Sequence, residues 1–187
     1  MALTKSNMMA LETMAPDFTL PDAVSEKKLS LKDLQSDKGT VVMFICNHCP
    51  YVIHVRQGLV KVAQEYSAKG ISFIAINSND VENYPEDSPA NMKKQALKYQ
   101  YPFPYLFDET QNVAQAYKAA CTPDFYVFDK NLKCVYRGRM DDSRPESGIP
   151  VTGKDLRGAL DNLLSGKPID PNQVPSMGCN IKWKTST

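Results

Sequence analysis

The sequence predicts an α/β domain whose mixed β-sheet is covered by helices on both faces. Two apolar, β-prone runs, residues 40–45 and 71–77, flank an amphipathic helical pattern and so form a βαβ unit with a parallel strand pair. The turn signal at residues 129–131 separates two further strand-like runs, 124–128 and 132–137, which predicts an antiparallel hairpin. Both kinds of pairing, interleaved with helices, define the mixed α/β class.

A short amino-terminal β extension precedes the βαβ unit. Extended pieces at residues 18–20 and 28–31 flank a Pro21–Asp22 turn, and Ser30 with Asp33 fits a capping box for a brief helical turn. Between the two buried strands, apolar residues recur at spacings of three and four and mark one face of a helix: Val52, Val55, Leu59, Val62 and Tyr66.

A polar, turn-rich segment follows the second buried strand. Residues 77–89 predict a long loop. We interpret its carboxylates as solvated surface charges: Asp80, Glu82, Glu86 and Asp87. Beyond this loop, residues 90–99 are weakly helical, residues 105–107 form a short strand and residues 113–117 form a short helix.

The final helix follows a charged loop. Residues 139–144 carry a dense cluster of charges, which we interpret as a solvated loop with local ion pairs; the alternative is the rim of a substrate groove. Thr152 and Asp155 fit a capping box for the helix that follows. The helix then presents one apolar face: Leu156, Leu160, Leu163 and Leu164.

Length and charge restrict the class of protein. The 187 residues predict one domain, residues 1–187, with a core over about residues 12–165 and a C-terminal tail over residues 166–187. Lysine plus arginine total 22 against 21 aspartate plus glutamate, which favours neither a nucleic-acid partner nor an anionic membrane surface. The longest apolar run, Val41–Cys46, is far shorter than the ~20 residues of a membrane-spanning helix. The amino terminus has no secretory pattern, so we expect a cytoplasmic protein with reduced cysteines.

The strongest chemical signal is Cys46-Asn47-His48-Cys49, which follows a buried strand and opens the amphipathic helix. A helix amino terminus carries unpaired N–H groups and a partial positive charge, so it lowers the pKa of a sulfur placed there. We therefore expect Cys46 to be the low-pKa, solvent-facing nucleophile and Cys49, more buried, to resolve its mixed disulfide. His48 has two interpretations: a cation that stabilises the Cys46 thiolate, or an exposed loop histidine that barely couples to it.

Other motifs accompany this one. Thr122-Pro123 begins a hairpin strand, and strand, CxxC, helix, strand and Thr-Pro together resemble the thioredoxin superfamily. The run Ala15-Pro16-Asp17-Phe18-Thr19-Leu20-Pro21 resembles the amino-terminal motif of its peroxiredoxin (AhpC/TSA) branch. Four runs are similar to a bacterial group of peroxiredoxin-like thioredoxin-family proteins: residues 46–52, 121–125, 138–143 and 178–183.

The resemblance implies a thioredoxin-like fold and a thiol–disulfide oxidoreductase that works through Cys46 and Cys49. Its substrate is a protein or small-molecule disulfide, its reductant is a thiol such as thioredoxin or glutathione, and it needs no cofactor. The peptide bond before Pro123 is expected to be cis, with the Thr122 backbone free to pair with an incoming substrate strand. Further residues are expected to tune the site: Asn47, His48, Pro50, Thr122 and Pro123.

Two alternatives use the same cysteines. A thiol-dependent peroxidase with an antioxidant role is motivated by the amino-terminal motif, but neither cysteine ends the Pro-x-x-x-Thr-x-x-Cys run that shapes a peroxide pocket. A metal-binding module would take ligands from Cys46, Cys49, His48 or His54. A closed zinc site needs four ligands, usually from two paired clusters, and the second cluster is missing, so we predict no metal site.

Three cysteines lie outside the motif. Cys121, two residues before Pro123, is either a third redox partner or a small buried hydrophobe. Cys134 lies within a predicted strand and is assigned to the core. Cys179 lies in the tail, which can fold back to an active site. It is either an accessory redox residue, paired with Cys121 or with a partner protein, or a free thiol in a packed tail.

Overall fold

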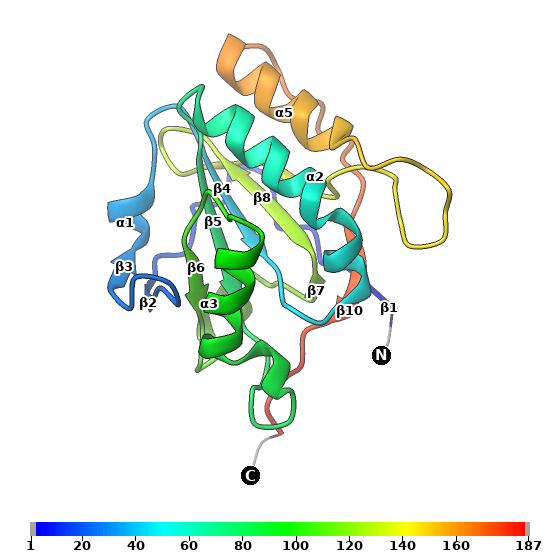
Figure 1. Cartoon of the computed structure of the whole chain (residues 1–187). Coiled ribbons are helices and arrows are strands. Elements are labelled where there is room, and N and C mark those ends of the chain that lie inside the picture. The colour runs from blue at the N-terminus through cyan, green and yellow to red at the C-terminus, as the bar shows by residue number, and fades with distance from the viewer. Residues whose placement is uncertain (1–2, 186–187) are drawn as a thin grey trace.

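A five-stranded mixed sheet forms the centre of the computed structural model, which describes residues 3–185 (Figure 1). The two residues at each end of the predicted 1–187 domain lie outside this range. The strand order is β6-β5-β4-β8-β9. Strands β6, β5 and β4 pair in parallel, whereas β8 pairs antiparallel with both β4 and β9, which confirms the βαβ unit and the hairpin. The strands are β4 (Thr40–Phe44), β5 (Ser72–Asn77), β6 (Tyr105–Phe107), β8 (Asp124–Phe128) and β9 (Cys134–Gly138).

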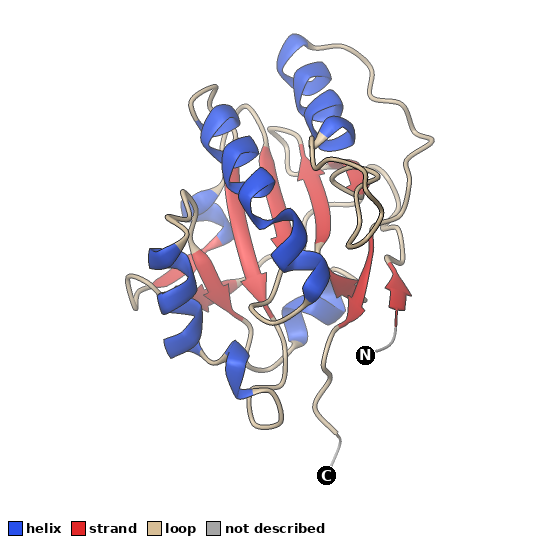
Figure 2. Ribbon diagram, turned by 45° about the vertical axis from the view of Figure 1, so that its right-hand side comes forward, coloured by secondary structure: helices blue, strands red, loops and turns tan. Residues whose placement is uncertain are grey.

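Helices cover both faces of this sheet, as predicted (Figure 2). Strand β4 is buried throughout because its side chains alternate between the two layers. Val41 and Met43 pack in the layer of α2, α3 and α5, and Val42 and Phe44 pack in the layer of α1 and α4. The helices are α1 (Leu31–Leu34), α2 (Pro50–Ser67), α3 (Pro89–Lys98), α4 (Asn112–Ala116) and α5 (Lys154–Ser165).

The amino-terminal extension forms a two-stranded antiparallel sheet of β2 (Thr19–Pro21) and β3 (Lys28–Ser30). The predicted capping box at α1 is present. The Asp33 N–H donates to Ser30 Oγ at 3.1 Å, and the Ser30 N–H donates to Asp33 Oδ2 at 3.0 Å. These two bonds fix the entry of the chain into α1.

A third, small sheet joins the two ends of the chain to the segment before Pro123. Its order is β1-β10-β7, and all its pairs are antiparallel. Residues 177–180 of the tail therefore belong to the fold, as the central strand of this sheet. The strands are β1 (Leu3–Lys5), β7 (Cys121–Thr122) and β10 (Met177–Asn180).

The second predicted capping box, at α5, is wrong. Gly153 occupies the N-cap in a left-handed conformation, and no side chain caps the helix there. The reason is Asp141, whose Oδ2 accepts the N–H groups of Thr152 at 2.8 Å and Gly153 at 2.6 Å. The Asp141 carboxylate thus fixes the backbone conformation at the start of α5. No helix within residues 3–185 has the length and apolarity to cross a membrane.

Candidate active site

The CxxC segment links β4 to α2, but the helix begins later than the sequence predicts. Pro50 is the first helical residue and Cys49 is the N-cap. Proline suits this position because its missing N–H has no helical partner there. Cys46 therefore lies in the loop before the helix, and the expectation that Cys46 opens α2 is wrong.

Both sulfurs are buried, and the thiolate is favoured on the second cysteine. Cys46 is 1% exposed and Cys49 is 0% exposed, so the prediction of a solvent-facing Cys46 is wrong. The Cys46 thiol donates to Cys49, and this bond, with the Cys179 thiol and the nearby N–H groups of Val52 and Cys179, lowers the pKa of Cys49 to about 5. That same bond, burial and the negative charge of Asp87 raise the pKa of Cys46.

Thr122 and Pro123 lie against both sulfurs, because β8 is the antiparallel neighbour of β4 and begins where β4 ends. Thr122 Oγ1 lies 3.4 Å from Cys46 Sγ, and the Thr122 carbonyl oxygen lies 3.4 Å from Cys49 Sγ. The Thr122–Pro123 peptide is cis, as predicted. The Thr122 backbone is not free for a substrate, however, because it pairs with Cys179 of β10.

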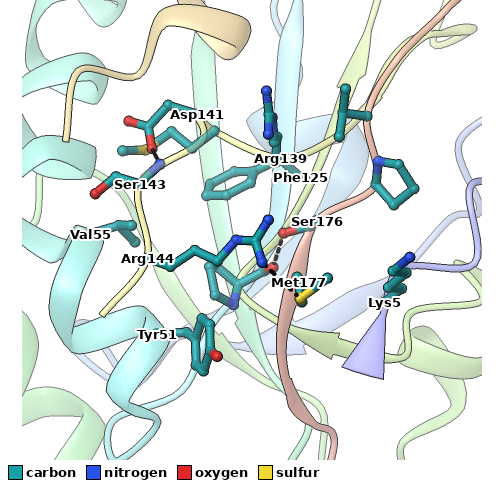
Figure 3. A pocket seen from close by; sticks show the side chains of 14 residues that line it. Lys5, Tyr51, Val55, Phe125, Arg139, Asp141, Ser143, Arg144, Ser176 and Met177 are labelled. Atoms are coloured by element: carbon teal, nitrogen blue, oxygen red, sulfur yellow. Dashed lines mark hydrogen bonds between the residues drawn. The ribbon is translucent and has the colours of Figure 1, made fainter. Parts of the chain in front are cut away.

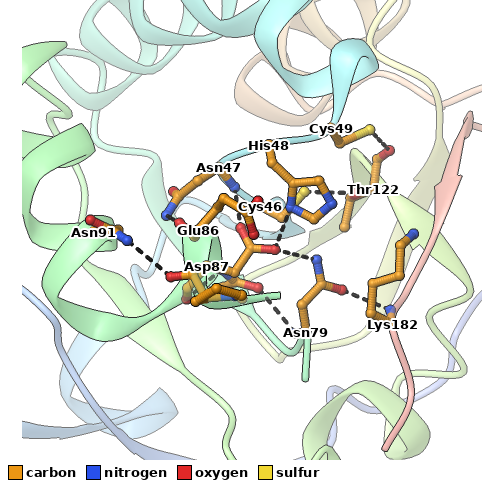
Figure 4. Close-up of polar contacts among 12 residues, drawn as sticks. Cys46, Asn47, His48, Cys49, Asn79, Glu86, Asp87, Asn91, Thr122 and Lys182 are labelled. Atoms are coloured by element: carbon orange, nitrogen blue, oxygen red, sulfur yellow. Dashed lines mark hydrogen bonds and ion pairs between the residues drawn. The ribbon is translucent and has the colours of Figure 1, made fainter. Parts of the chain in front are cut away.

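Asp87 is the centre of a buried polar cluster beneath the CxxC loop (Figure 4). It accepts the Asn47 N–H at 2.7 Å and the Asn79 side-chain amide at 2.7 Å, and it pairs with His48 Nδ1 at 2.7 Å. Burial works to raise the pKa of Asp87, but the bonds from His48, Asn79 and Asn47 outweigh it and hold that pKa below its ordinary value.

The interpretation of the 77–89 carboxylates as solvated is half wrong. Glu82 and Glu86 are exposed, whereas Asp80 and Asp87 are buried, at 3% and 0% exposure. The segment follows β5, whose carboxyl end lies beside that of β4 in the parallel pair. Because both strands end at the same edge of the sheet, this topology could have located Asp87 near the cysteines.

His48 is coupled to Asp87 and is not a free loop histidine. Its ring stacks on Tyr84, with centroids 5.6 Å apart and planes inclined by 10°. The bond to Asp87 raises the pKa of His48 above its ordinary value, despite the opposing effect of burial. The imidazolium charge is therefore held by this carboxylate, which also lies near Cys46.

Asn47 fixes the loop between the two cysteines. Its N–H donates to Asp87, its side-chain amide donates to the Glu86 carbonyl at 2.8 Å, and its side-chain oxygen accepts the Tyr105 hydroxyl at 3.0 Å. Its carbonyl oxygen accepts Arg56 Nη2 at 3.1 Å. The segment thus presents both sulfurs from a rigid frame.

The three remaining cysteines separate into two groups. Cys134 is buried in β9, as predicted. Cys121 is also buried, its sulfur lies 3.9 Å from the Pro123 carbonyl oxygen, and burial raises its pKa far above the ordinary value. Cys179 differs, because its thiol contacts Cys49. The structure thus brings Cys179 into the site and leaves Cys121 beside it.

The histidines and cysteines do not assemble the ligand set that the metal hypothesis named. Donor atoms of Cys46, His48 and Asp87 lie within 4.8 Å of one another. Cys49 is not in this group, and His54 Nε2 lies 2.6 Å from Ser143 Oγ. The Asp87 oxygens are already engaged by two N–H donors and by His48.

A pocket of about 170 Å³ opens beside Pro123 (Figure 3). Tyr51, Met177 and the side chains of Arg139 and Arg144 help to line it. The 139–144 loop does form ion pairs, such as Arg139–Asp155 at 2.6 Å, but it also shapes this pocket, and so the solvated-loop interpretation is incomplete.

Comparisons with known proteins agree with this geometry. The chain matches a solved structure of an uncharacterized conserved protein from Geobacillus kaustophilus at 60% identity, with a TM-score of 0.98, over 100% of this chain and 99% of that one. The thioredoxin domain of a thiol-disulfide oxidoreductase from Bacteroides vulgatus shares the fold, with a TM-score of 0.59 and 17% identity over 81% of this chain and 99% of that one.

A more distant sequence relative is the thiol-disulfide oxidoreductase ResA of Halalkalibacterium halodurans, 28% identical over 65% of this chain and 64% of the relative. The alignment thus spans less than two thirds of that protein. The AhpC/TSA family model matches residues 11–137. The molecule is a thioredoxin-fold protein with a buried dithiol at the start of a helix, and the chain belongs to the AhpC/TSA family.

Proposed function

We propose that this protein is a thiol–disulfide oxidoreductase whose redox pair is Cys46 and Cys49. The observation that carries the proposal is the hydrogen bond from the Cys46 thiol to the Cys49 sulfur, just before the first turn of α2. This hydrogen bond favours the thiolate on Cys49. A stabilised thiolate is the attacking species in disulfide exchange. The name of the ResA relative, thiol-disulfide oxidoreductase, supports the same activity.

We assign the first attack to Cys49, because its sulfur accepts bonds from the thiols of Cys46 and Cys179 and from two N–H groups, and this assignment reverses the order expected from the sequence. The Cys49 thiolate attacks one sulfur of a substrate disulfide RSSR, forms a Cys49–SR bond and releases RS⁻. The Cys46 sulfur then attacks Cys49, and its proton leaves with the second product, RSH. The substrate gains two electrons, and the protein is left with a Cys46–Cys49 disulfide.

The charge of the side chains that line the pocket beside Pro123 indicates which class of disulfide the protein binds. Lys5 and Arg144 contribute positive charge to its lining, and Tyr51 contributes an aromatic ring (Figure 3). Cations at a rim attract anionic partners, so we propose a disulfide that carries carboxylates, of the glutathione class, as the small-molecule substrate. Glutathione or thioredoxin would restore the dithiol.

The test compares glutathione disulfide reduction by the wild type, Cys46→Ser and Cys49→Ser, with Cys121→Ser as the matched buried control. Cys49→Ser should abolish the reaction, because it removes the attacking sulfur. Cys46→Ser combined with Cys179→Ser, which removes both thiols that contact Cys49, should stall with glutathione attached to Cys49, and intact-protein mass spectrometry detects this adduct. Unchanged exchange rates in both Cys46→Ser and Cys49→Ser would overturn the proposal. Hydrogen peroxide, offered in parallel, should be consumed no faster than by a free thiol.

For the compartment, we propose the cytoplasm, where thiols are kept reduced. The chain has five cysteines, and an odd number argues against a complete set of intramolecular disulfides, which supports a reducing environment. The measurement is thiol trapping after cell fractionation. A protein found outside the cytoplasm would contradict the assignment.

A further inference from the structure

The chain's own C-terminal strand occupies the place where a substrate strand was expected. Strand β10 pairs antiparallel with β7, and Cys179 lies opposite Thr122. Gly178 permits this approach, because a Cβ at this position would lie 1.9 Å from the Thr122 carbonyl oxygen. The strand therefore lies closer to the site than any residue with a side chain would allow at this position.

This register carries the Cys179 sulfur to Cys49. The Cys49 sulfur lies 3.4 Å from the carbonyl oxygen of Thr122, the residue that pairs with Cys179. The Cys179 thiol donates to the Cys49 sulfur, so Cys49 contacts a cysteine on either side, Cys46 and Cys179. Burial, with this bond, raises the pKa of Cys179 to about 12, so Cys179 is a proton donor in the reduced state.

Buried bonds on both sides hold β10 in this position. Before the strand, the Ser176 N–H donates to Ser6 Oγ at 2.9 Å. After it, the Lys182 N–H donates to Asn79 Oδ1 at 2.8 Å, and the Lys182 carbonyl oxygen accepts the Gln111 side-chain amide at 2.9 Å. Asn79 also donates to Asp87, so the polar cluster of the CxxC loop anchors the tail as well (Figure 4). Cys179 is thus preorganised against Cys49.

We propose that Cys179 is a third redox-active cysteine, which forms a disulfide with Cys49 in exchange for the Cys46–Cys49 disulfide. The inference rests on the proposed function for the first oxidation and extends it to a three-cysteine relay. Three sulfurs in contact, with Cys49 in the middle, are the arrangement that such a relay needs.

The exchange is balanced without a further oxidant. Cys179 loses its proton and attacks the Cys49 sulfur of the Cys46–Cys49 disulfide. The Cys49–Cys179 bond forms, the Cys46–Cys49 bond breaks, and Cys46 leaves as a thiolate that takes up the proton. No electrons are gained or lost by the protein in this step. The product ties β10 to α2 and returns Cys46 to the thiol form.

The test uses the full-length chain in three forms: Cys46→Ser, Cys46→Ser with Cys179→Ser, and Cys46→Ser with Cys121→Ser as the matched control from the neighbouring strand. Each is oxidised with diamide, which joins neighbouring thiols without any substrate, and mapped by peptide mass spectrometry. We expect a Cys49–Cys179 disulfide in Cys46→Ser and in the Cys121 control, and its complete loss in the Cys179 variant. Circular dichroism confirms that each variant is folded.

A Cys46→Ser protein that is folded but leaves Cys49 and Cys179 as free thiols under diamide would overturn the inference. Failure of the proposed function has a different signature, because glutathione disulfide exchange would then be unaffected by Cys46→Ser and Cys49→Ser. A second readout tests the relay in the wild type. Equilibrated in a glutathione buffer, the Cys179→Ser protein should contain only the Cys46–Cys49 disulfide. The wild type should be a mixture of molecules with the Cys46–Cys49 disulfide and molecules with the Cys49–Cys179 disulfide. A wild type with no Cys49–Cys179 disulfide at any poise would also overturn the inference.

Discussion

The Cys49 sulfur gains its low pKa from donors in three separate segments of the chain. Cys46 lies in the loop before α2, Val52 in the first turn of α2, and Cys179 in β10. The Val52 N–H at the start of α2 supplies only part of the lowering of the Cys49 pKa, and the hydrogen bond from the Cys46 thiol supplies the largest part. The reactivity of one residue therefore reports on the assembly of the whole site.

Replacing Cys46 with alanine should raise the pKa of Cys49 from about 5 toward the ordinary thiol value of about 8.5, because the largest donor to the thiolate is lost. The ultraviolet absorbance of the thiolate, followed against pH, measures this shift. Cys121→Ala should leave the titration near pH 5 unchanged. A Cys46→Ala protein that still titrates there would show that the N–H groups and Cys179 suffice.

Replacing Asp87 with asparagine should lower the pKa of His48 toward its ordinary value of about 6.5, because the bond to this carboxylate is what raises it. The pKa of Cys46 should fall as well, since the negative charge of Asp87 opposes a nearby thiolate. Proton NMR of the imidazole ring measures the first effect, and His54→Gln assigns the signal, as the chain has two histidines. An unchanged His48 midpoint would contradict the ion pair.

At the scale of elements, β10 closes the site. It pairs with β7 on one side and β1 on the other, and it covers Cys49 while supplying Cys179. Edge strands are usually protected by a neighbouring element, and here the tail protects β7. Reactivity of the buried sulfurs thus depends on how firmly this strand is held.

Gly178→Ala should loosen that strand, because the added Cβ would meet the Thr122 carbonyl oxygen. We expect a loss of about 1–3 kcal/mol in the free energy of unfolding and faster alkylation of Cys49 by iodoacetamide. Gly158→Ala is the matched control. Nothing lies within 4 Å of a Cβ at that position inside α5, so this variant should gain about 0.5–1 kcal/mol and leave alkylation unchanged. Equal alkylation rates in the two variants would contradict a closing role for β10.

At the scale of the whole molecule, two buried groups give stability opposite dependences on pH. Cys49 has a pKa of about 5, below that of the unfolded chain, so its contribution is present above about pH 8.5 and is lost as the pH falls through 5. Burial raises the pKa of Asp124 to about 8. Its contribution is present below about pH 3.9 and is lost as the pH rises through 8.

Asp124→Asn isolates the second of these effects. The amide stays neutral, so between about pH 4 and 8 the wild type should lose stability relative to the variant by up to about 1.4 kcal/mol per pH unit. Urea unfolding at pH 5, 6 and 7 gives the difference directly. A constant difference across this range would mean that Asp124 is ionised in the folded protein, despite its full burial.

Local patterns predicted most of the elements. The continuous apolar run of β4 and the three- and four-residue spacing of apolar residues in α2 depend on neighbours along the chain, and both elements formed as expected. The start of α2 was misplaced at Cys46, although proline favours the first position of a helix and Pro50 occupies that position.

Two parts of the site depend on contacts far apart in the sequence. Asp87 lies in a segment whose composition is that of a solvated loop, and its burial follows from β5 ending beside β4. Cys179 reaches Cys49 through the pairing of β10 with β7, between segments more than fifty residues apart. No periodicity records such a pairing, so the sequence identified the cysteine and left its partner open.

The β1-β10-β7 sheet has a consequence for the newly made protein. Chains emerge from the ribosome with the amino terminus first, so β4, α2 and β8 can fold before β10 exists outside it. Until residues 177–182 arrive, Cys49 lacks its cover and its third donor. The dithiol of a nascent chain is therefore more accessible to cellular oxidants and thiols than that of the finished protein, and its oxidation state can be set during synthesis.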